Sequence, residues 1–393
     1  MDVLVAHNFY QQAGGEDQAV AAEVAVLKAH GHNVIQYCLH NDSIDAKHRL
    51  DVASRTIWSW PTFHELRQLF QTHRPHIAHF HNTFPLISPA GYYAARAENI
   101  RVVQTLHNFR LLCPNALLFR EGGVCEACLG KSIAWPGVVH KCYRDSFAAT
   151  SVVAAMLGVH RAMGTWRSAV DVYIALSEFS RNKLIEGGLP AEKVVLKSNF
   201  VHPDPGPGSG VGGYVVFIGR LSAEKGLKTL LDAWRRLDGK LPLKVIGDGP
   251  MAAVVKEAAA KDAAIQWLGV KPLQAVYEAI GEAAALVLPS QCYENFPRVI
   301  VEAFAKGTPV LASGHGAMAT IVNNGHTGLL FRPGDPADLA EKVEGILADP
   351  IRLARMRKAA REEFLLNFTA EANHRTLITI YENTLGTGGC PNA

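Results

Sequence analysis

The feature that most constrains the fold is a repeated alternation of short apolar runs with helical segments. Continuous apolar runs, rather than alternating ones, are typical of a parallel sheet covered by helices on both faces. In the first half of the chain the strand candidates are Val3–Ala6, Val34–Tyr37, Ile77–Phe80, Val102–Leu106 and Val172–Ala175. The segments with apolar residues at helical spacing are Gln18–Ala29, Phe63–Gln71 and Pro89–Ala97. This half therefore predicts an α/β domain with a parallel sheet.

The alternation breaks once, at the run of proline and glycine over residues 202–213, which is typical of a linker. A second series of strand candidates follows, at Tyr214–Ile218, Leu243–Ile246, Ile265–Leu268, Ala285–Leu288 and Pro309–Leu311. A chain of 393 residues suits two domains of about 200 residues each. We therefore expect domains over residues 1–200 and 214–368, joined by a linker at 201–213. The final segment, 369–393, is expected to form a helix that packs back on the first domain.

Composition narrows the class of protein. The chain is 48% apolar and 19% charged, as in a globular protein, and its formal charge of +3 does not call for nucleic acid as a partner. Residues 1–6 begin like a buried strand and not like a signal peptide. The uncharged stretch Ser146–Val159 is too short to span a bilayer. Seven unevenly spread cysteines indicate a reducing compartment, so we expect a cytoplasmic protein that can rest peripherally on a membrane.

Two such domains facing each other would place the carboxyl ends of both sheets around a cleft, where ligands of open α/β sheets bind. After the first strand, Gly14 and Gly15 precede a helix, so backbone N–H groups could approach a phosphate at its positive end. A tight turn is the alternative for such a pair. The segment lacks the G-x-G-x-x-G spacing, which counts against a dinucleotide site.

The loops of the second domain carry stronger signals. Arg220 and Lys225 follow its first strand, next to Gly219 and a helix start. Two cations so placed suit a diphosphate, because they neutralise the charge that builds on it as it leaves. A solvated surface loop is the alternative. The next strand closes with a glycine-rich turn that a nucleotide could approach, at Gly247, Asp248 and Gly249.

A pair of carboxylates lies around a predicted helix start. Glu294 falls in the loop, Pro297 fits the first helical position, and Glu302 follows about a turn and a half into the helix. The first-turn amides would then point at an anion, while one carboxylate reaches sugar hydroxyls and the other a ribose diol. Glutamate is common on helices, but Glu302 lies in an apolar run and therefore needs a partner.

In order and spacing, these motifs resemble the retaining GT-B glycosyltransferases of family GT4, along nearly the whole chain. The resemblance rests on three motifs, which are Gly219-Arg220 with Lys225-Gly226, Gly247-Asp248-Gly249-Pro250, and the E-x7-E frame of Glu294 and Glu302. It implies an α/β fold of GT-B type, with two Rossmann-like doubly wound parallel-sheet domains facing a central cleft. The donor would be bound chiefly by the second domain and the acceptor mainly by the first.

The resemblance also implies roles for single residues. Arg220 and Lys225 would hold the diphosphate, Glu294 the donor sugar and Glu302 the ribose. Gly14 and Gly15 would approach the diphosphate from the first domain. His107, which follows a strand, is similar to the family residue that contacts the donor sugar. Weaker candidates for the cleft are Asp17, His79 and His81.

One position departs from the family pattern. Many members have glycine where this chain has Pro297. Proline removes an amide donor, which leaves the amides of Asn295 and Phe296 to meet the sugar or phosphate.

The reaction implied is a same-face, retaining substitution in which the leaving diphosphate takes the acceptor proton. We find no D-x-D pair at a strand end to carry Mg²⁺, so we expect no catalytic cofactor. The donor would be a UDP-, GDP- or ADP-sugar, and the acceptor a carbohydrate or a polyprenol-linked sugar in polysaccharide or cell-envelope glycan synthesis. A GT-B protein that binds nucleotide sugar without transferring it is one alternative. A nicotinamide-dependent oxidoreductase is another, disfavoured by the missing glycine motif.

The first domain also contains a cysteine-rich insertion over about residues 108–145. Its C-x2-C pair with two flanking cysteines has the spacing of a structural zinc site, for which His140 could replace one ligand. Buried free thiols or a redox-labile pair are the alternative. The four candidate ligands are Cys113, Cys125, Cys128 and Cys142.

An amphipathic face toward lipid is a further hypothesis, with half-buried packing as its alternative. The aromatic members of this face would be Trp58, Trp60 and Phe63, and its basic members Lys47, Arg55 and Arg67.

Overall fold

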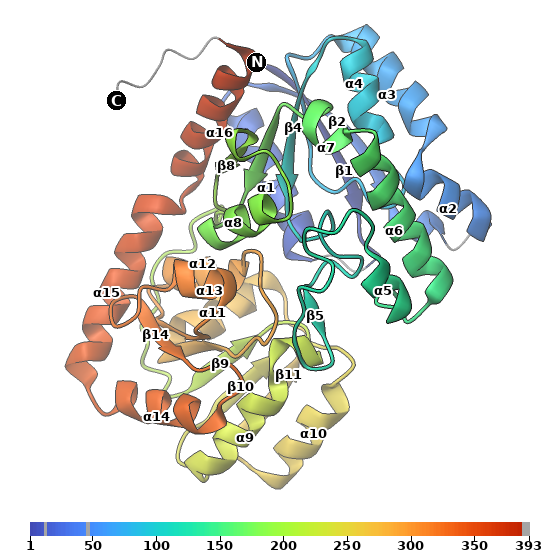
Figure 1. Ribbon diagram of the computed structural model, residues 1–393. Helices are drawn as coiled ribbons and strands as arrows, with labels where there is room; N and C mark the ends of the chain where they lie inside the picture. The colour runs from blue at the N-terminus through green and yellow to red at the C-terminus, as the bar shows by residue number, and fades with distance from the viewer. Residues whose placement is uncertain (12–13, 45–47, 387–393) are drawn as a thin grey trace. The chain divides into compact units, whose positions relative to one another are not determined.

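The computed structural model describes residues 1–11, 14–44 and 48–386 (Figure 1). The chain divides into two compact units. Unit 1 comprises Met1–Leu118, Cys125–Asn199 and the C-terminal helix from Asn373, and unit 2 comprises Phe119–Val124 and Phe200–Ala372. In the part of the chain that is described, every helix is too short or too polar to cross a bilayer.

Unit 1 is built on a six-stranded sheet with the order β2-β1-β3-β4-β7-β8, and its paired strands run parallel. The strand order changes direction between β1 and β3, because β1 pairs with β2 on one side and with β3 on the other. This is the topological switch point at which open α/β sheets bind ligands. The strands are β1 (Asp2–Phe9), β2 (Asn33–His40), β3 (Ile77–Phe80), β4 (Arg101–Leu106), β7 (Val172–Ala175) and β8 (Val194–Leu196).

The helices of unit 1 bury their apolar faces on this sheet. Val20, Val24 and Leu27 of the first helix join Val3 and Val5 of β1 in one core cluster, because they recur at helical spacing. Leu377, Ile380 and Tyr381 of the last helix complete the same cluster. The helices are α1 (Gly15–Ala29), α2 (Arg49–Ile57), α3 (Trp60–His73), α4 (Ala90–Ala97), α5 (Trp135–Val139), α6 (Phe147–Ala162), α7 (Thr165–Ser168), α8 (Glu178–Glu186) and α16 (Ala370–Leu385), with 3-10 turns η1 (Asn41–Ile44) and η2 (Ala191–Lys193).

Unit 2 holds a second six-stranded parallel sheet, with the order β11-β10-β9-β12-β13-β14. Its switch point lies between β9 and β12, which pair directly through Val215 with Ala285 and Val216 with Leu286. The strands are β9 (Val215–Ile218), β10 (Leu243–Ile246), β11 (Ile265–Gly269), β12 (Ala285–Leu288), β13 (Val310–Ser313) and β14 (Gly328–Phe331), and a two-stranded hairpin is formed by β5 (Phe119–Arg120) and β6 (Gly123–Val124).

The core of unit 2 lies between its sheet and its helices. Phe217 and Val245 of the sheet are fully buried against Trp234 and Val343 of the helices. The helices are α9 (Leu227–Leu237), α10 (Ala252–Lys261), α11 (Leu273–Glu282), α12 (Arg298–Ala305), α13 (Gly316–Ile321), α14 (Pro336–Leu347) and α15 (Pro350–Asn367), preceded by the 3-10 turn η3 (Ala223–Lys225).

The proline- and glycine-rich stretch before β9 contains no helix or strand, and it belongs to unit 2. The amides of Gly208, Gly210 and Gly212 each donate a hydrogen bond of 2.9 Å, to the carbonyls of Lys306, Gly281 and Glu282 respectively. This part of the stretch therefore packs along the ends of α11 and α12.

The predicted fold class is confirmed, since both halves form Rossmann-like parallel sheets. The strand candidates of the sequence each overlap a strand of the structure. Two edge strands, β8 and β14, and the short hairpin β5–β6 were not predicted, because runs of two to four residues carry little periodic signal.

Candidate active site

The first candidate site lies at the switch point of unit 2, where the loops after β9 and β12 leave adjacent strands. Lys225, at the end of η3, donates a hydrogen bond of 2.6 Å from Nζ to Oε1 of Glu294. The Ser290 hydroxyl donates to the same oxygen at 2.7 Å. His315 approaches the Ser290 carbonyl with Nε2, at 2.9 Å. The tertiary structure thus joins a cation and a carboxylate that are 69 residues apart in the sequence.

Both members of this ion pair are charged at neutral pH. Burial alone would raise the pKa of Glu294, but the neighbouring Lys225 ammonium and the Ser290 hydroxyl bring it below the ordinary value. Burial alone would lower the pKa of Lys225, and Glu294 outweighs that effect and raises it. An ammonium held in this way is a fixed positive charge at the edge of the sheet, and an anion can bind to it there.

The glycine-rich turns beside this pair interlock through their backbones. The Leu221 amide donates to the Asp248 carbonyl at 2.9 Å, and the Gly219 amide donates to the Ile246 carbonyl at 3.1 Å. Gly247 has a φ of +135°, and a Cβ there would clash with the carbonyl oxygen of Gly219. Only glycine fits this close approach without displacing the loop. Exposed backbone at such a turn can approach a phosphate or a ribose.

Two further predicted residues lie on these loops. Arg220 is exposed on the loop after β9. The Asp248 side chain accepts the Gly249 amide at 2.7 Å, so that it stabilises its own turn.

The helix after Glu294 starts one residue later than predicted. Pro297 is the N-cap residue, with extended backbone, and α12 begins at Arg298. The expectation that Pro297 is the first helical residue is therefore wrong. The Asn295 and Phe296 side chains are buried just before the cap, and the Phe296 ring packs against Phe368 at 6.3 Å between centroids.

Glu302 has the partner that its apolar surroundings require. Its carboxylate lies 3.5 Å from the Arg298 guanidinium, one helical turn earlier. Burial raises the pKa of Glu302, and Arg298 partly opposes this effect. A buried carboxylate at this depth can accept hydrogen bonds from a diol with little competition from water.

The second candidate site is a cavity of unit 1 at the carboxyl ends of β1, β3 and β4. His107 lines this cavity, and its Nε2 lies 2.9 Å from Nδ1 of His81. Burial lowers the pKa of His107 well below the ordinary value, so the ring is neutral at pH 7. Further polar side chains on the wall of this cavity include Tyr10, Glu16, Asn108 and Arg110.

Tyr10, Glu16 and Arg110 were not singled out from the sequence. The Tyr10 hydroxyl donates to Oε2 of Glu16 at 2.9 Å, and burial raises the pKa of Glu16 to about 7. The Arg110 guanidinium lies over the Phe84 ring, 4.4 Å from its centroid. Tyr10 directly follows β1, Glu16 lies in the first turn of α1, and Arg110 lies in the loop after β4, and these places are the signal that could have found them.

The Gly14-Gly15 turn is capped by its own helix. Gly14 is the N-cap of α1, and its amide donates to Oδ2 of Asp17 at 3.0 Å. Oδ1 of Asp17 lies 2.8 Å from Nε2 of His7. Asp17 thus acts as a capping residue, and the approach of a diphosphate to Gly14 and Gly15 stays a prediction.

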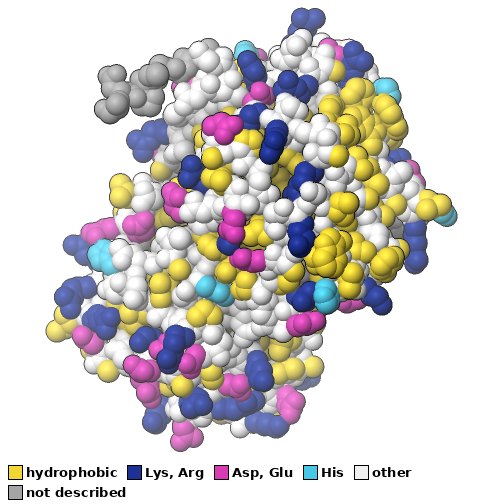
Figure 2. All heavy atoms as spheres, in the orientation of Figure 1, with side chains coloured by type: hydrophobic (Ala, Val, Ile, Leu, Met, Phe, Trp, Pro, Cys, Tyr) yellow, Lys and Arg dark blue, Asp and Glu magenta, His cyan; other side chains and the backbone are white. Residues whose placement is uncertain are grey.

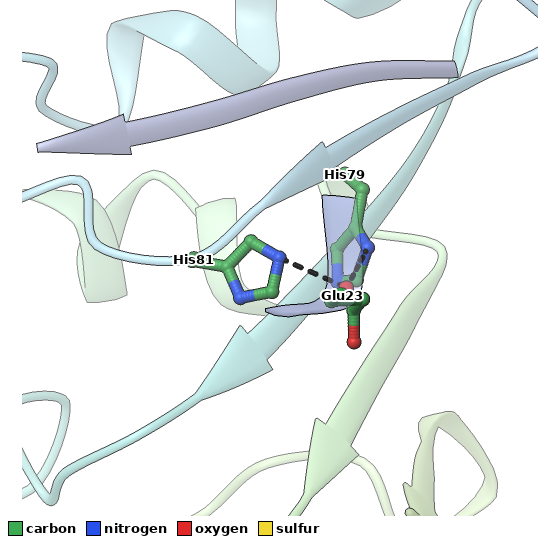
Figure 3. Close-up of side chains that lie close together, drawn as sticks. All are labelled: Glu23, His79 and His81. Carbon is green, nitrogen blue, oxygen red and sulfur yellow. Dashed lines mark ion pairs between the residues drawn. The ribbon is translucent and has the colours of Figure 1, made fainter. Parts of the chain in front are cut away.

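His79 is fully buried away from the cavity wall, between the Tyr381 hydroxyl at 2.7 Å and the Thr105 hydroxyl at 2.8 Å. Together with Glu23 and His81 it forms the cluster in Figure 3. Within the described ranges, this is the one set of three metal-capable side chains whose ligand atoms lie within 4.8 Å of one another.

The cysteine-rich insertion does not form such a set. Cys113, Cys125, Cys128 and Cys142, all within the described part of the chain, form no disulfide, and neither they nor His140 belong to a group of three ligand atoms within 4.8 Å of one another. Burial raises the pKa of Cys113, and that of Cys128 to about 11, so these two thiols are protonated at neutral pH. The predicted zinc site therefore has no support in the structure, in which Cys113 and Cys128 are buried and Cys125 and Cys142 are half-buried.

Comparison with known proteins identifies both units. The family model "Glycosyltransferase Family 4" matches residues 13–205, and the model "Glycosyl transferases group 1" matches residues 211–363. The Mycobacterium tuberculosis protein named glycogen synthase is 34% identical over 160 residues, which cover 39% of this chain and 38% of that protein. The Streptomyces kanamyceticus 2-deoxystreptamine glucosyltransferase is 31% identical over 204 residues, covering 50% of this chain and 51% of that protein. The chain thus spans about half or less of the length of these curated relatives.

A solved structure resembles nearly the whole chain. HepE of Anabaena in complex with UDP has a TM-score of 0.68 and 18% identity, covering 97% of this chain and 99% of that chain. This likeness establishes the fold. With two parallel Rossmann-like sheets and the two family models together, the chain belongs to the GT4-type, group 1 glycosyltransferases of GT-B fold.

Proposed function

We propose that this chain is a retaining glycosyltransferase that moves a sugar from a nucleoside diphosphate donor without a catalytic metal. The observation that carries the proposal is the Lys225–Glu294 pair, with 2.6 Å between Nζ and Oε1, at the switch point of unit 2. A glycine-rich turn, a fixed cation and a helix start meet there, and these three features suit a diphosphate.

Each candidate site residue of unit 2 then has a chemical role. Lys225 and Arg220 neutralise the charge that develops on the departing diphosphate, together with the amides at the start of α12. Glu294, oriented by Lys225 and Ser290, accepts hydrogen bonds from hydroxyls of the donor sugar. Glu302 accepts the ribose diol from within the helix.

Retention follows if the acceptor attacks the face that the diphosphate leaves. The departing phosphate oxygen takes the acceptor proton, so that no protein base is required. His107, neutral at pH 7, contacts the donor sugar from unit 1, and the cavity that it lines holds the acceptor. Gly14 and Gly15 approach the diphosphate from the same unit.

The donor is a UDP-, GDP- or ADP-sugar, and UDP is favoured because HepE of the same fold was solved with UDP. A panel of UDP, GDP, ADP and NAD in thermal-shift assays tests this directly. The matching nucleotide should stabilise the protein by about 3 kcal/mol at a hundredfold excess over its Kd. Hydrolysis of each nucleotide sugar, followed by release of the nucleotide, then identifies the sugar without knowledge of the acceptor. Stabilisation by NAD alone would refute the proposal.

The second candidate function is binding of nucleotide sugar without transfer. The Ser290 hydroxyl and Lys225 both hold Glu294 in a fixed orientation, which favours the enzyme, because a carboxylate facing the sugar serves turnover and not nucleotide binding. Binding of UDP-sugar without hydrolysis or transfer to any acceptor would favour the binder.

A carbohydrate or lipid-linked acceptor, in polysaccharide or cell-envelope glycan synthesis, is part of the proposal. The aromatic face predicted from the sequence is mostly packed, since Trp58 contacts Trp60, Phe63 and Tyr93 at ring-centroid distances of 5.2 to 6.1 Å. Arg55 is bound to Asp51 and Arg67 to Glu98, while Lys47 lies outside the described residues.

A different surface of unit 1 suits a membrane better than the aromatic face does. It is formed by α5, the loop before α5 and the start of α6, and four apolar side chains there are 58% to 62% exposed. In Figure 2 hydrophobic side chains gather on the side where Figure 1 labels these helices. We name as the apolar face Ile133, Trp135, Val139 and Phe147, and exposed basic neighbours in the sequence are Lys131, Lys141 and Arg144.

This combination of apolar and basic residues suits the anionic inner leaflet of a membrane. Binding to anionic vesicles should fall with salt and should weaken in the double variant Trp135→Ala/Phe147→Ala. Trp60→Ala is the matched control, because Trp60 is 60% exposed but belongs to the packed aromatic group. Equal binding of all three proteins would remove the apolar face from the proposal.

A further inference from the structure

A buried cluster of charged and polar side chains adjoins the cavity of unit 1, whose wall includes His81, and has no role in the chemistry proposed above. Glu23 of α1 receives a hydrogen bond of 2.7 Å from Nζ of Lys197, which follows β8. Its other oxygen, Oε1, lies 3.2 Å from Nδ1 of His79 and 3.2 Å from Nε2 of His81. Figure 3 marks both contacts with dashed lines. All four residues are less than 5% exposed. Burial of an ion pair costs several kcal/mol in desolvation, so such a pair calls for an explanation beyond stability.

The cluster continues to the cavity wall. His81 meets Glu23 with Nε2 and meets Nε2 of His107 with Nδ1, at 2.9 Å. Lys197, Glu23, His81 and His107 therefore form a series of contacts whose last two members line the cavity.

The protons in this series can be assigned from chemistry. Burial alone would raise the pKa of Glu23, but Lys197 and the two histidines hold it well below the ordinary value, so Glu23 is a carboxylate. A carboxylate only accepts hydrogen bonds. In the described part of the chain, Glu23 Oε1 and His81 Nε2 have no hydrogen-bond partner of good geometry, and they lie 3.2 Å apart. A small rotation lets each satisfy the other, with the proton on Nε2 of His81.

The tautomer of His107 follows from the contact between its Nε2 and Nδ1 of His81. When His81 carries its one proton on Nε2, its Nδ1 has a lone pair, so the 2.9 Å contact requires a proton on Nε2 of His107. Because His107 is neutral, its Nδ1 then keeps a lone pair. The other ionisable groups that face these rings are His7 of β1, with its partner Asp17, and Tyr381 of α16.

The same atoms could hold a metal ion, but their neighbours favour protons. The Lys197 ammonium contacts the same carboxylate and would repel a second cation. Both nitrogens of His79 already have hydroxyl partners, from Tyr381 and Thr105.

We propose that Lys197, Glu23 and His81 are positioning residues that fix His107 as the Nε2–H tautomer, so that its Nδ1 accepts a hydrogen bond from a hydroxyl of the sugar bound there. The tautomer assignment stands on the contacts of unit 1. Only the identity of the bound sugar rests on the proposed function.

The test is long-range ¹H–¹⁵N correlation spectroscopy of the full chain labelled with ¹⁵N-histidine, with His107 assigned through His107→Asn. The expected result at pH 7.5 is a protonated Nε2 and a bare Nδ1. A proton on Nδ1 of His107 would overturn the proposal, because it would mean that His81 is an imidazolium or the opposite tautomer. A stoichiometric metal ion whose removal by chelator changes the signals of His79 and His81 would also overturn it.

Variants separate positioning from mere packing. Glu23→Gln is combined with Lys197→Met, because removal of one partner alone leaves a buried charge. In this double variant the His107 signals should show both tautomers. Tyr381→Phe, which removes a buried hydroxyl next to His79 and leaves the series intact, should keep the wild-type pattern. Unchanged His107 signals in the double variant would refute the proposal even if its stability falls.

Enzyme assays distinguish failure of the tautomer proposal from failure of the proposed function. The double variant should lower kcat about 10- to 100-fold, as loss of a partner that orients a histidine does elsewhere. The KM for the nucleotide sugar should stay within about threefold, since the nucleotide is bound by unit 2. If the tautomer pattern is as expected but no nucleotide sugar is turned over, the tautomer proposal holds and the proposed function is wrong. If transfer is measured and His107 carries its proton on Nδ1, only the tautomer proposal is wrong.

Discussion

The switch point of unit 2 and the cavity of unit 1 occupy the same edge of their parallel sheets but are built from different groups. In unit 2 the loops after β9 and β10 are interlocked through backbone amides and carbonyls, and one ion pair stands beside them. In unit 1 the corresponding edge carries imidazole, phenol and carboxyl groups that contact one another. The diphosphate is the same in every donor, so backbone amides and fixed cations can bind it. Sugars differ in the orientation of their hydroxyls, so side chains are needed to distinguish them.

The largest effect should come from the ion pair of unit 2. Glu294→Gln keeps the volume of the side chain but weakens its hydrogen bonds to sugar hydroxyls, so kcat should fall about 10²- to 10³-fold with little change in UDP affinity. Lys225→Ala should lose as much turnover and should also weaken UDP binding. Steady-state kinetics and calorimetric titration with UDP measure the two effects.

Lys228→Ala is the matched control, because Lys228 is an exposed lysine three residues further along the same segment. It should leave kcat and UDP affinity within about twofold of the wild type. Near-native turnover by Glu294→Gln, or loss of UDP binding caused by a variant of the unit 1 cavity alone, would reverse the assignment of the two units.

A smaller effect should follow from the interlocked turns. Gly247→Ala places a Cβ against the Gly219 carbonyl at a φ of +135°, so the loop must shift. We expect a loss of about 1 to 3 kcal/mol in the free energy of unfolding and about tenfold weaker UDP binding. The control is Gly345→Ala, within α14, where a Cβ meets no neighbour within 4 Å. This substitution should be neutral or slightly stabilising, as alanine is in helices. If both variants bind UDP as the wild type does, the turn is not part of the donor site.

The smallest effect concerns Glu16 in unit 1. The pKa of this carboxyl is about 7 in the folded state, against 4.5 for its ordinary value. Between these two values the folded state binds more protons than the unfolded state, so ionisation of Glu16 lowers stability as pH rises. Glu16→Gln removes this cost and should be more stable than the wild type at pH 8, by about 1 to 3 kcal/mol, and equal to it at pH 4. Urea unfolding at both values measures the difference. A variant that is equally stable at pH 8 would show that Glu16 is ionised at no cost.

Much of the fold could be predicted because strands of a parallel sheet are continuous apolar runs. Ile77–Phe80 and Ala285–Leu288 are fully buried, and the observed bounds of β3 and β12 are those predicted. The short edge strand β8 carries too little pattern, with one buried residue in three. The strand orders of the two sheets depend on pairings between distant segments, which no local pattern encodes.

The candidate site divides in the same way. The partner that Glu302 needed is Arg298, at the helical spacing of four residues, and such a pair is visible in sequence. The contact of Lys225 with Glu294 and that of Lys197 with Glu23 join residues 69 and 174 positions apart, so only the folded chain brings them together. The cysteines show the converse, because their close spacing in the sequence does not produce, among the described residues, a group of three ligand atoms within 4.8 Å of one another.

The Glu294 carboxylate, which is bound to Lys225, has a consequence for the end of the proposed catalytic cycle. An incoming nucleotide must share the ammonium with Glu294, and a departing one gives it back, so that the Lys225 ammonium is paired in the unliganded protein as well. Affinity for the spent nucleotide is reduced by this competition, and release of the by-product becomes easier. We therefore expect inhibition by free UDP to be weaker than a lone lysine at the same place would produce, which keeps the enzyme working while its product accumulates.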